Sequence, residues 1–147
     1  MESVVVMLRS CYPVKLDTNN HSVFFMHYHL VMVIKYRRCV LDEPVSNRAK
    51  AIFEYIAPNY NITLLEWNHD RDHVHVLFKA QPNSALSTFI NAYKSASSRL
   101  IKQEFPDVRE KLWKAYFWSR SYCLLTTGGA PLEVIRDYIE TQGERRR

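Results

Sequence analysis

The chain has 147 residues, which fits one compact domain, and 47% of them are hydrophobic, enough for an ordinary buried core. Its 20 Lys and Arg residues outnumber 15 Asp and Glu residues, and the net charge of +5 favours a polyanionic partner. The sequence has no apolar run of about 18 residues and no CxxC pair among its 3 cysteines, so we expect a cytoplasmic protein with reduced thiols and no membrane span.

The predicted elements follow the order β-α-β-β-α-β-α. Residues 1–20 are predicted to form an irregular arm or a short strand that ends in a turn cluster at residues 17–20. Runs of β-branched and aromatic residues predict strands at 22–36, 62–68, 73–80 and 121–127. Apolar residues at helical spacing and helix-opening prolines predict helices at 43–58, 84–104, 107–113 and 131–142. This order indicates an α+β fold, a ferredoxin-like or RRM-like sandwich with a central antiparallel sheet. We expect an N-terminal arm (1–20) and a single domain (21–147).

The segment from Asp72 to Phe78 carries two histidines on a predicted strand. Because side chains alternate along a strand, His73 and His75 project to one face while the intervening apolar residues face the core. Two imidazoles at this spacing can share one divalent ion, and a third ligand must then come from elsewhere. Half-buried structural histidines are the alternative reading.

A second pair, His27 and His29, has the same spacing on the first predicted strand. This pair is an alternative metal site, or it lines the interior face of a central strand. We rank it below His73 and His75, because that pair follows a turn and lies beside charged residues that can orient imidazole rings.

The last predicted helix places Tyr138 and Gln142 one turn apart, on the border of an apolar stripe. A tyrosine can act as a covalent nucleophile once it is activated. A free phenol has a pKa of about 10, so a cation that polarises the target phosphate would be needed at neutral pH. Alternatively, Tyr138 simply packs against the domain with its hydroxyl in water.

Basic and aromatic residues alternate in three stretches of the chain, and cations that contact phosphates beside rings that stack on unpaired bases are typical of nucleic-acid binding. The candidate DNA contacts are Lys35, Arg37, Arg38, Lys94 and Arg99. Trp113 and Trp118 belong to the third stretch and are equally compatible with a place in the core.

Taken together, these segments resemble the single-tyrosine HUH transposases, the small TnpA-type enzymes of insertion sequences that move as single-stranded DNA. The resemblance spans roughly residues 22–142. The matching stretches are Tyr28–Val31, Lys35–Arg38, Asp72–Leu77, Lys94–Arg99, Leu112–Trp113, Phe117–Tyr122, Thr126–Gly129 and Ile135–Gln142.

The resemblance implies that His73, His75 and Gln142 hold Mg²⁺ or Mn²⁺ and that Tyr138 attacks a DNA phosphate. A 5′-phosphotyrosine then forms, and a second 3′-hydroxyl later reverses the step. The resemblance also implies a homodimer whose active sites are shared between chains, with Gly128 and Gly129 as a hinge. The implied substrate is single-stranded DNA with hairpin ends, so the protein would lie on the nucleoid when bound.

Three other functions remain open at this stage. A non-catalytic DNA hairpin-binding regulator of the same fold would keep hairpin binding without cleavage. A related nickase of replication or plasmid transfer would usually carry extra domains. A small sheet-based metalloprotein unrelated to DNA would leave the basic and aromatic stretches unexplained. The N-terminal arm and the basic tail, Arg145 to Arg147, have no assigned role.

Overall fold

The structure is a computed structural model that describes residues 4–7, 13–19, 22–126 and 132–144. Four strands form an antiparallel sheet in the order β5-β6-β4-β7. They are β4 (His27–Val33), β5 (Thr63–His69), β6 (His73–Lys79) and β7 (Cys123–Thr126). The first and third of these strands lie side by side in the middle, as in a ferredoxin-like βαββαβ fold, and the predicted fold class is confirmed.

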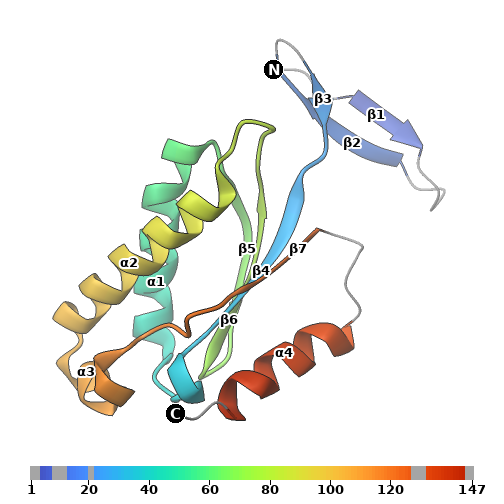
Figure 1. Ribbon diagram of the computed structural model, residues 1–147. Coiled ribbons are helices and arrows are strands. Elements are labelled where there is room, and N and C mark those ends of the chain that lie inside the picture. Colours follow the sequence, from blue (N-terminus) through green and yellow to red (C-terminus); the bar gives the residue numbers. More distant parts are fainter. Residues whose placement is uncertain (1–3, 8–12, 20–21, 127–131, 145–147) are drawn as a thin grey trace.

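Helices lie on both faces of this sheet (Figure 1). The helices α1 (Glu43–Ile56) and α2 (Leu86–Glu104) cover one face, and α4 (Leu132–Glu144) lies against the other. Two short elements, α3 (Pro106–Lys111) and the 3-10 helix η3 (Trp113–Ala115), connect α2 to β7. They replace the single helical piece predicted at 107–113. Among the described residues, no helix combines the length and apolar character that crossing a membrane requires.

The main core lies between the sheet and helices α1 and α2. Phe53 of α1 is fully buried, and its ring centroid lies 5.0 Å from that of Phe89 and 5.3 Å from that of Tyr93, both on α2. It also reaches the sheet, with its centroid 6.1 Å from that of Phe78. These edge-on and tilted aromatic contacts fix how the two helices sit on the sheet.

Local signals set the ends of α1. The Asp42 side chain accepts a hydrogen bond from the Val45 backbone N–H at 3.1 Å, and Pro44 occupies the first turn, where proline is favoured. The helix ends at Ile56 rather than at Pro58. It tightens there into the 3-10 turn η2 (Ala57–Tyr60), and Asn61 follows with a left-handed backbone.

The single strand predicted at 22–36 is wrong in one respect, because three elements occupy this stretch. They are β3 (Val23–Phe24), β4 and the 3-10 turn η1 (Lys35–Arg37). Backbone pairing continues just past the strand, where the Ile34 N–H donates to the Asp72 carbonyl and the Lys35 N–H donates to the Phe117 carbonyl, and the chain then turns at Tyr36 and Arg37, which have positive φ. Tertiary contacts therefore override the strand propensity of Tyr36.

The N-terminal arm contains more regular structure than expected. Strand β2 (Pro13–Thr18) pairs with both β1 (Val4–Met7) and β3 in a second antiparallel sheet, which extends beyond the end of the main sheet (Figure 1). Asp17 and Thr18 of the predicted turn cluster lie in β2 instead, residues 20 and 21 lie outside the described residues, and the Asn19 side chain accepts a hydrogen bond from the Ser22 N–H at 2.7 Å. An ion pair of 3.5 Å between Asp17 and Lys79 joins this sheet to β6.

Candidate active site

The two histidines of the DHVH segment lie on the sheet face opposite the main core. On β6, Val74, Val76 and Phe78 are fully buried, while His73 and His75 point the other way, as the alternation predicted. The register pairs His75 with Val31 and His73 with Val33 of β4. Because directly paired residues point to the same face of a sheet, the two imidazoles lie beside these two valines.

His73 is held by a carboxylate that is held in turn by an arginine. Its Nδ1 lies 2.9 Å from Oδ1 of Asp72, and the Nε of Arg37 lies 2.8 Å from Oδ2 of the same carboxylate. Burial acts to raise the pKa of Asp72, but the hydrogen bonds from His73 and Arg37 outweigh it and hold that pKa below its ordinary value. With Nδ1 donating to the carboxylate, Nε2 of His73 is the nitrogen whose lone pair can bind a metal.

His75 contacts a third histidine. Its Nε2 lies 3.1 Å from Nδ1 of His29 on the neighbouring strand. Burial lowers the pKa of His75, and the charges of His29 and His73 lower it further, whereas Glu66 opposes them. A lowered pKa favours the neutral imidazole, which is the form that ligates metal ions.

The two histidine pairs considered from the sequence are therefore not separate alternatives. His29 joins the cluster of His73 and His75, whereas the ring of His27 stacks on Phe25 with centroids 4.0 Å apart. In the part of the chain that the structure describes, no group of three His, Cys, Asp or Glu residues has a metal-binding arrangement.

Helix α4 brings Tyr138 to the same face of the sheet. Tyr138 and Ile139 pack against a small cluster that contains Val31 and Val33, the two residues paired with the histidines. The Tyr138 hydroxyl lies 2.9 Å from the Ser121 hydroxyl. Burial raises the pKa of Tyr138, which the hydrogen bond to Ser121 opposes, so the phenol is more firmly protonated than a free one.

Gln142 lies one turn beyond Tyr138, and its Oε1 accepts a 2.5 Å hydrogen bond from the Ser119 hydroxyl. Both side chains are thus bound to the segment just before β7. Among the described residues, no hydrogen bond joins Tyr138 or Gln142 to His73 or His75. The structure places the four predicted residues on one face in two groups: the histidines on β6, and the tyrosine and glutamine on α4.

The predicted DNA contacts occupy different environments. Arg38 and Arg99 are exposed, whereas Arg37 is paired with Asp72. Lys94 is half-buried and donates to the Ser119 and Arg120 carbonyls at 2.9 and 2.8 Å. Lys35 lies over the Tyr36 ring, 5.3 Å from its centroid. Arg37 and Lys94 therefore already serve intramolecular roles.

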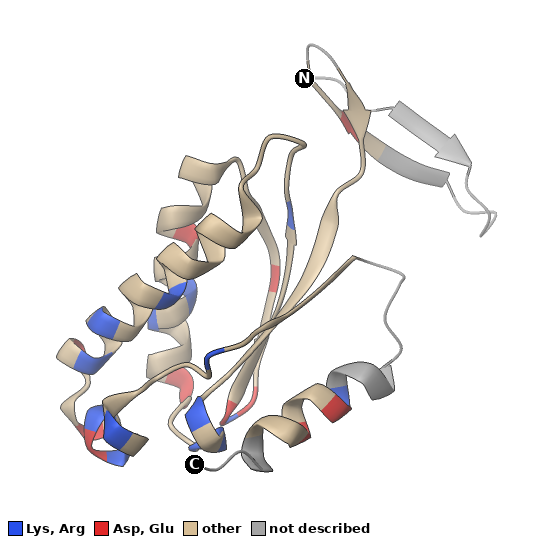
Figure 2. Cartoon of the chain, in the orientation of Figure 1, with Lys and Arg blue, Asp and Glu red and all other residues tan. Residues whose placement is uncertain are grey.

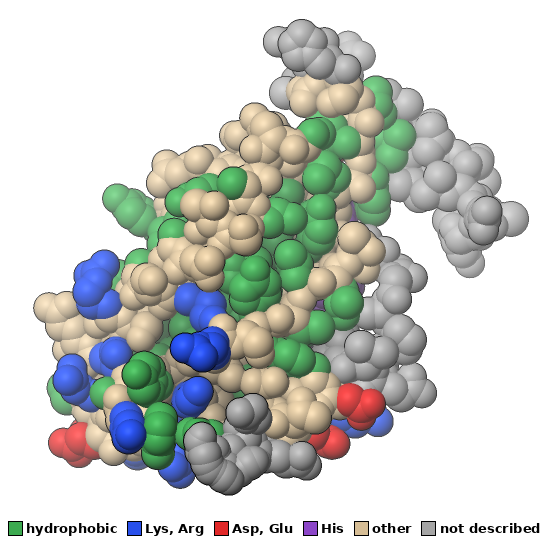
Figure 3. All heavy atoms as spheres, in the orientation of Figure 1, with side chains coloured by type: hydrophobic (Ala, Val, Ile, Leu, Met, Phe, Trp, Pro, Cys, Tyr) green, Lys and Arg blue, Asp and Glu red, His purple; other side chains and the backbone are tan. Residues whose placement is uncertain are grey.

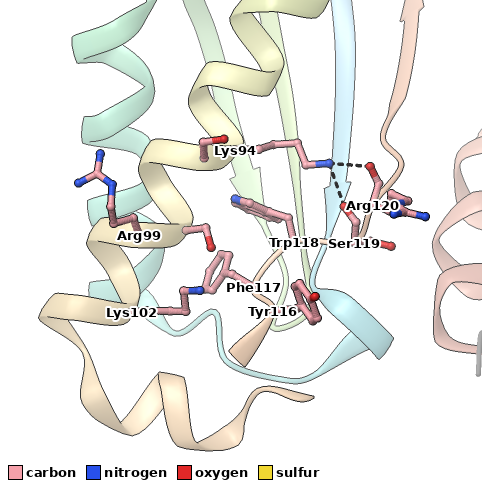
Figure 4. A pocket seen from close by; sticks show the side chains of 10 residues that line it. Lys94, Arg99, Lys102, Tyr116, Phe117, Trp118, Ser119 and Arg120 are labelled. Atoms are coloured by element: carbon pink, nitrogen blue, oxygen red, sulfur yellow. Dashed lines mark hydrogen bonds between the residues drawn. The ribbon is translucent and has the colours of Figure 1, made fainter. Parts of the chain in front are cut away.

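Lys94 and Arg99 line an open pocket between α2 and the segment before β7 (Figure 4). We call it the basic-aromatic pocket; its lining residues are Lys94, Ser95, Ser98, Arg99, Lys102 and 116–120. Trp118 is buried against α2, and Trp113 is half-buried with its ring edge-on to Tyr36. Lys and Arg side chains gather at this end of the molecule, around apolar side chains on the surface (Figures 2 and 3).

Sequence reasoning missed the partners that orient the site. The contacts of Ser119, Ser121 and His29 have no sequence signature, because each depends on which strand lies beside which. Asp72 was signalled only as a charged neighbour of His73, and Arg37 was assigned to DNA. A carboxylate directly before a candidate metal histidine was the one available signal of an orienting group.

The structure thus combines a ferredoxin-like sheet with two strand histidines and a helix tyrosine on one of its faces, and the comparisons identify the class of DNA-processing enzyme to which the chain belongs. The family model described as "Transposase IS200 like" matches residues 22–142, so the chain belongs to the IS200-like transposase family. The ISDra2 transposase TnpA of Deinococcus radiodurans is 34% identical over 133 residues, which cover 90% of this chain and 95% of that protein. The transposase for insertion sequence element IS200 of Salmonella typhimurium is 30% identical, over 84% of this chain and 81% of its own length.

Two solved structures share the fold. A putative transposase from Deinococcus radiodurans R1 superposes with a TM-score of 0.78 at 32% identity, covering 86% of this chain and 97% of that one. A REP-associated tyrosine transposase bound to a REP hairpin superposes with a TM-score of 0.54 at 9% identity, covering 84% and 69%. The second match shows the fold alone. The chain is thus a DNA transposase of an insertion-sequence family.

Proposed function

We propose that this transposase cleaves and rejoins single-stranded DNA at insertion-sequence ends through a covalent 5′-phosphotyrosine on Tyr138. His73, His75 and Gln142 would hold the required divalent ion, Mg²⁺ or Mn²⁺. One observation carries the proposal: the tyrosine helix packs on the two valines that are paired with the two histidines.

The residues present fit a divalent ion. His73 has Nδ1 engaged by Asp72, which leaves Nε2 as the ligand, and the low pKa of His75 favours its ligating form. Gln142 would add an amide oxygen, and this mixed donor set suits Mn²⁺, or Mg²⁺ with water and phosphate oxygens in the remaining positions. When bound, the ion supplies Lewis-acid polarisation of the scissile phosphate.

In the covalent step, bonds form and break only on the tyrosine and the DNA. The Tyr138 oxygen attacks the phosphorus, the bond from phosphorus to the 3′ oxygen breaks, and the phenolic proton ends on the leaving 3′-hydroxyl in the overall balance. A 3′-hydroxyl from a second strand then attacks the phosphotyrosine and restores the free phenol. Each phosphodiester broken is replaced by another, so no external energy source is needed.

DNA hairpins are the proposed recognition element, because a transposase of the same fold has been solved bound to a REP hairpin. The basic-aromatic pocket and the exposed Arg38 supply cations and rings of the kind that bind phosphates and bases. We further propose a homodimer in which α4 completes the site of the partner chain. The proposed hinge residues 128 and 129 and the basic tail (145–147) lie outside the described residues.

Single-stranded oligonucleotides that carry the insertion-sequence ends test the proposal directly. With Mn²⁺ or Mg²⁺, the chain should form a protein–DNA adduct that survives denaturing gel electrophoresis. The adduct should be absent after Tyr138→Phe and with EDTA, but present after Tyr55→Phe, a matched control because Tyr55 is 83% exposed on α1. An adduct retained by Tyr138→Phe would place the nucleophile elsewhere.

The His73→Ala variant separates catalysis from DNA binding. It should abolish cleavage and leave the affinity for a DNA hairpin, measured by fluorescence anisotropy, at the wild-type value. A parent protein that binds hairpins without ever cleaving would instead be the non-catalytic regulator.

A further inference from the structure

Arg37 was expected to contact DNA, but its guanidinium faces the candidate metal site. Its Nε donates to Oδ2 of Asp72, and Oδ1 of the same carboxylate accepts from Nδ1 of His73. The three side chains form one chain of charge-assisted hydrogen bonds. The exposed fractions of the Arg37, Asp72 and His73 side chains are 39%, 12% and 19%, so the two inner members are largely shielded from water.

The backbone of this segment is strained in a way that supports the contact. Tyr36 and Arg37 both have positive φ, 56° and 54°, in a region that favours glycine. Two such residues in succession are expensive, on the order of 1–3 kcal/mol each, and persist where surrounding contacts require them. Here the turn reverses the chain at the end of β4, and the Arg37 N–H donates to the Ile34 carbonyl at 2.7 Å.

The same turn is bound to the segment that contains Asp72. The Ile34 N–H donates to the Asp72 carbonyl, and the Leu41 N–H donates to the Arg71 carbonyl, both at 2.9 Å. Residues 34–41 are therefore hydrogen-bonded to the residues directly before β6, the strand that begins with His73. Helix α4 also contacts η1 (Figure 1). Arg37 thus belongs to a turn that contacts both the segment of Asp72 and the tyrosine helix.

We propose that Arg37 is a positioning residue that fixes Asp72, which in turn holds the His73 ring in the Nδ1–H tautomer with Nε2 left for the metal. The role of Nε2 in this inference rests on the proposed metal site, whereas the tautomer of His73 is a property of the protein without metal. Free histidine can present either nitrogen, so a ring without this support would be a weaker ligand. The phosphate-binding role predicted for Arg37 is thereby reassigned.

The tautomer is measured first, without metal, by long-range ¹H–¹⁵N NMR of the imidazoles in the full chain. The wild type should show His73 protonated at Nδ1, and Arg37→Gln should show a mixture of tautomers. Arg38→Gln is the matched control, because Arg38 is exposed on the adjacent position. An Nε2–H tautomer in the wild type, or an unchanged tautomer in Arg37→Gln, would overturn the proposal.

Metal affinity is measured next, by Mn²⁺ titration followed by electron paramagnetic resonance. Loss of an outer-shell partner weakens metal binding about 10- to 100-fold, so Arg37→Gln should lose affinity in this range. Arg37→Lys should recover part of the lost Mn²⁺ affinity, and Arg38→Gln should bind Mn²⁺ with the wild-type affinity. The affinity of Arg37→Gln for a DNA hairpin should stay unchanged at the physiological ionic strength of about 0.15 M.

The outcomes separate this inference from the proposed function. If Arg37→Gln keeps full Mn²⁺ affinity and loses hairpin binding, Arg37 is a phosphate contact and the positioning role is overturned. If the wild type shows the Nδ1–H tautomer, Arg37→Gln disturbs it, and neither protein binds Mn²⁺, the positioning of His73 stands while the proposed metal site fails. Near-ultraviolet circular dichroism of the variants excludes misfolding as the cause.

Discussion

At the scale of single residues, the protonation state of Tyr138 makes the rate of adduct formation depend on pH. The group ionises by losing a proton, and burial raises its pKa above the ordinary value of about 10, so the reactive phenolate is a small fraction at neutral pH. That fraction grows as pH rises towards the pKa. The initial rate of adduct formation should therefore increase between about pH 6 and pH 9, as measured in single-turnover assays with saturating Mn²⁺. A rate that stays level over this interval would show that loss of the phenolic proton does not limit the step.

Two basic residues of the same pocket should behave differently. Arg99 is exposed, so Arg99→Gln should weaken single-strand binding and reduce its salt dependence by about one counterion without changing the melting temperature. Lys94 is half-buried on two backbone carbonyls, and burial lowers its pKa, with the charge of Lys35 adding to this effect. Lys94→Met should instead lower the free energy of unfolding, by about 1–3 kcal/mol, because it leaves those carbonyls without their donor.

The measurements are fluorescence anisotropy at several salt concentrations and urea denaturation. A Lys94→Met protein with unchanged stability and a reduced salt slope would mean that Lys94 contacts phosphate, as the sequence suggested.

At the scale of elements, α2 is joined to the segment before β7 by a buried hydrogen-bond chain. The Trp118 Nε1–H donates to Oγ of Ser97 at 2.9 Å, and that hydroxyl donates to the Tyr93 carbonyl at 2.7 Å. Ser97→Ala should leave the Trp118 donor buried without a partner and destabilise the fold by about 1–3 kcal/mol. Ser95→Ala, on the exposed side of the same helix, should have little effect. Equal denaturation midpoints in urea for the two variants would contradict this assignment.

The elements show why some of the fold was predictable. The alternation of polar and apolar residues along β6 and the helical spacing of apolar residues along α2 predict which side chains are buried. The sequence therefore predicts that Val74 and Phe89 face the core and that His73 does not. The turn at Tyr36 does not follow from the sequence, because no glycine signals its positive φ and the contacts around it come from residues far along the chain. The same applies to the site: the histidines and the tyrosine have their own spacing signals, while the hydrogen bonds that hold them depend on strand order.

At the scale of the whole molecule, the N-terminal sheet is nearly independent of the main one. In the described part of the chain, β2 pairs with β1 and β3, and β4 begins the main sheet after them. The ion pair between Asp17 and Lys79 is partly exposed, and such pairs contribute little. Deleting residues 1–18 should therefore leave the melting temperature within a few degrees of the wild-type value, as measured by circular dichroism. A large fall would mean that this sheet stabilises the transposase domain.

The second face of the main sheet imposes a condition on any movement of the tyrosine helix. Val31 and Val33 have 0% exposure, and α4 is the helix that packs over them. Burying a valine side chain stabilises a fold by roughly 1.5–3 kcal/mol. Moving α4 away would expose both valine side chains to water and would lose that stabilisation at each position. If α4 moves away with Tyr138, another apolar surface is therefore needed to cover Val31 and Val33. An exchange of α4 between two chains would keep the two valines covered, whereas movement of α4 in a single chain would leave them exposed.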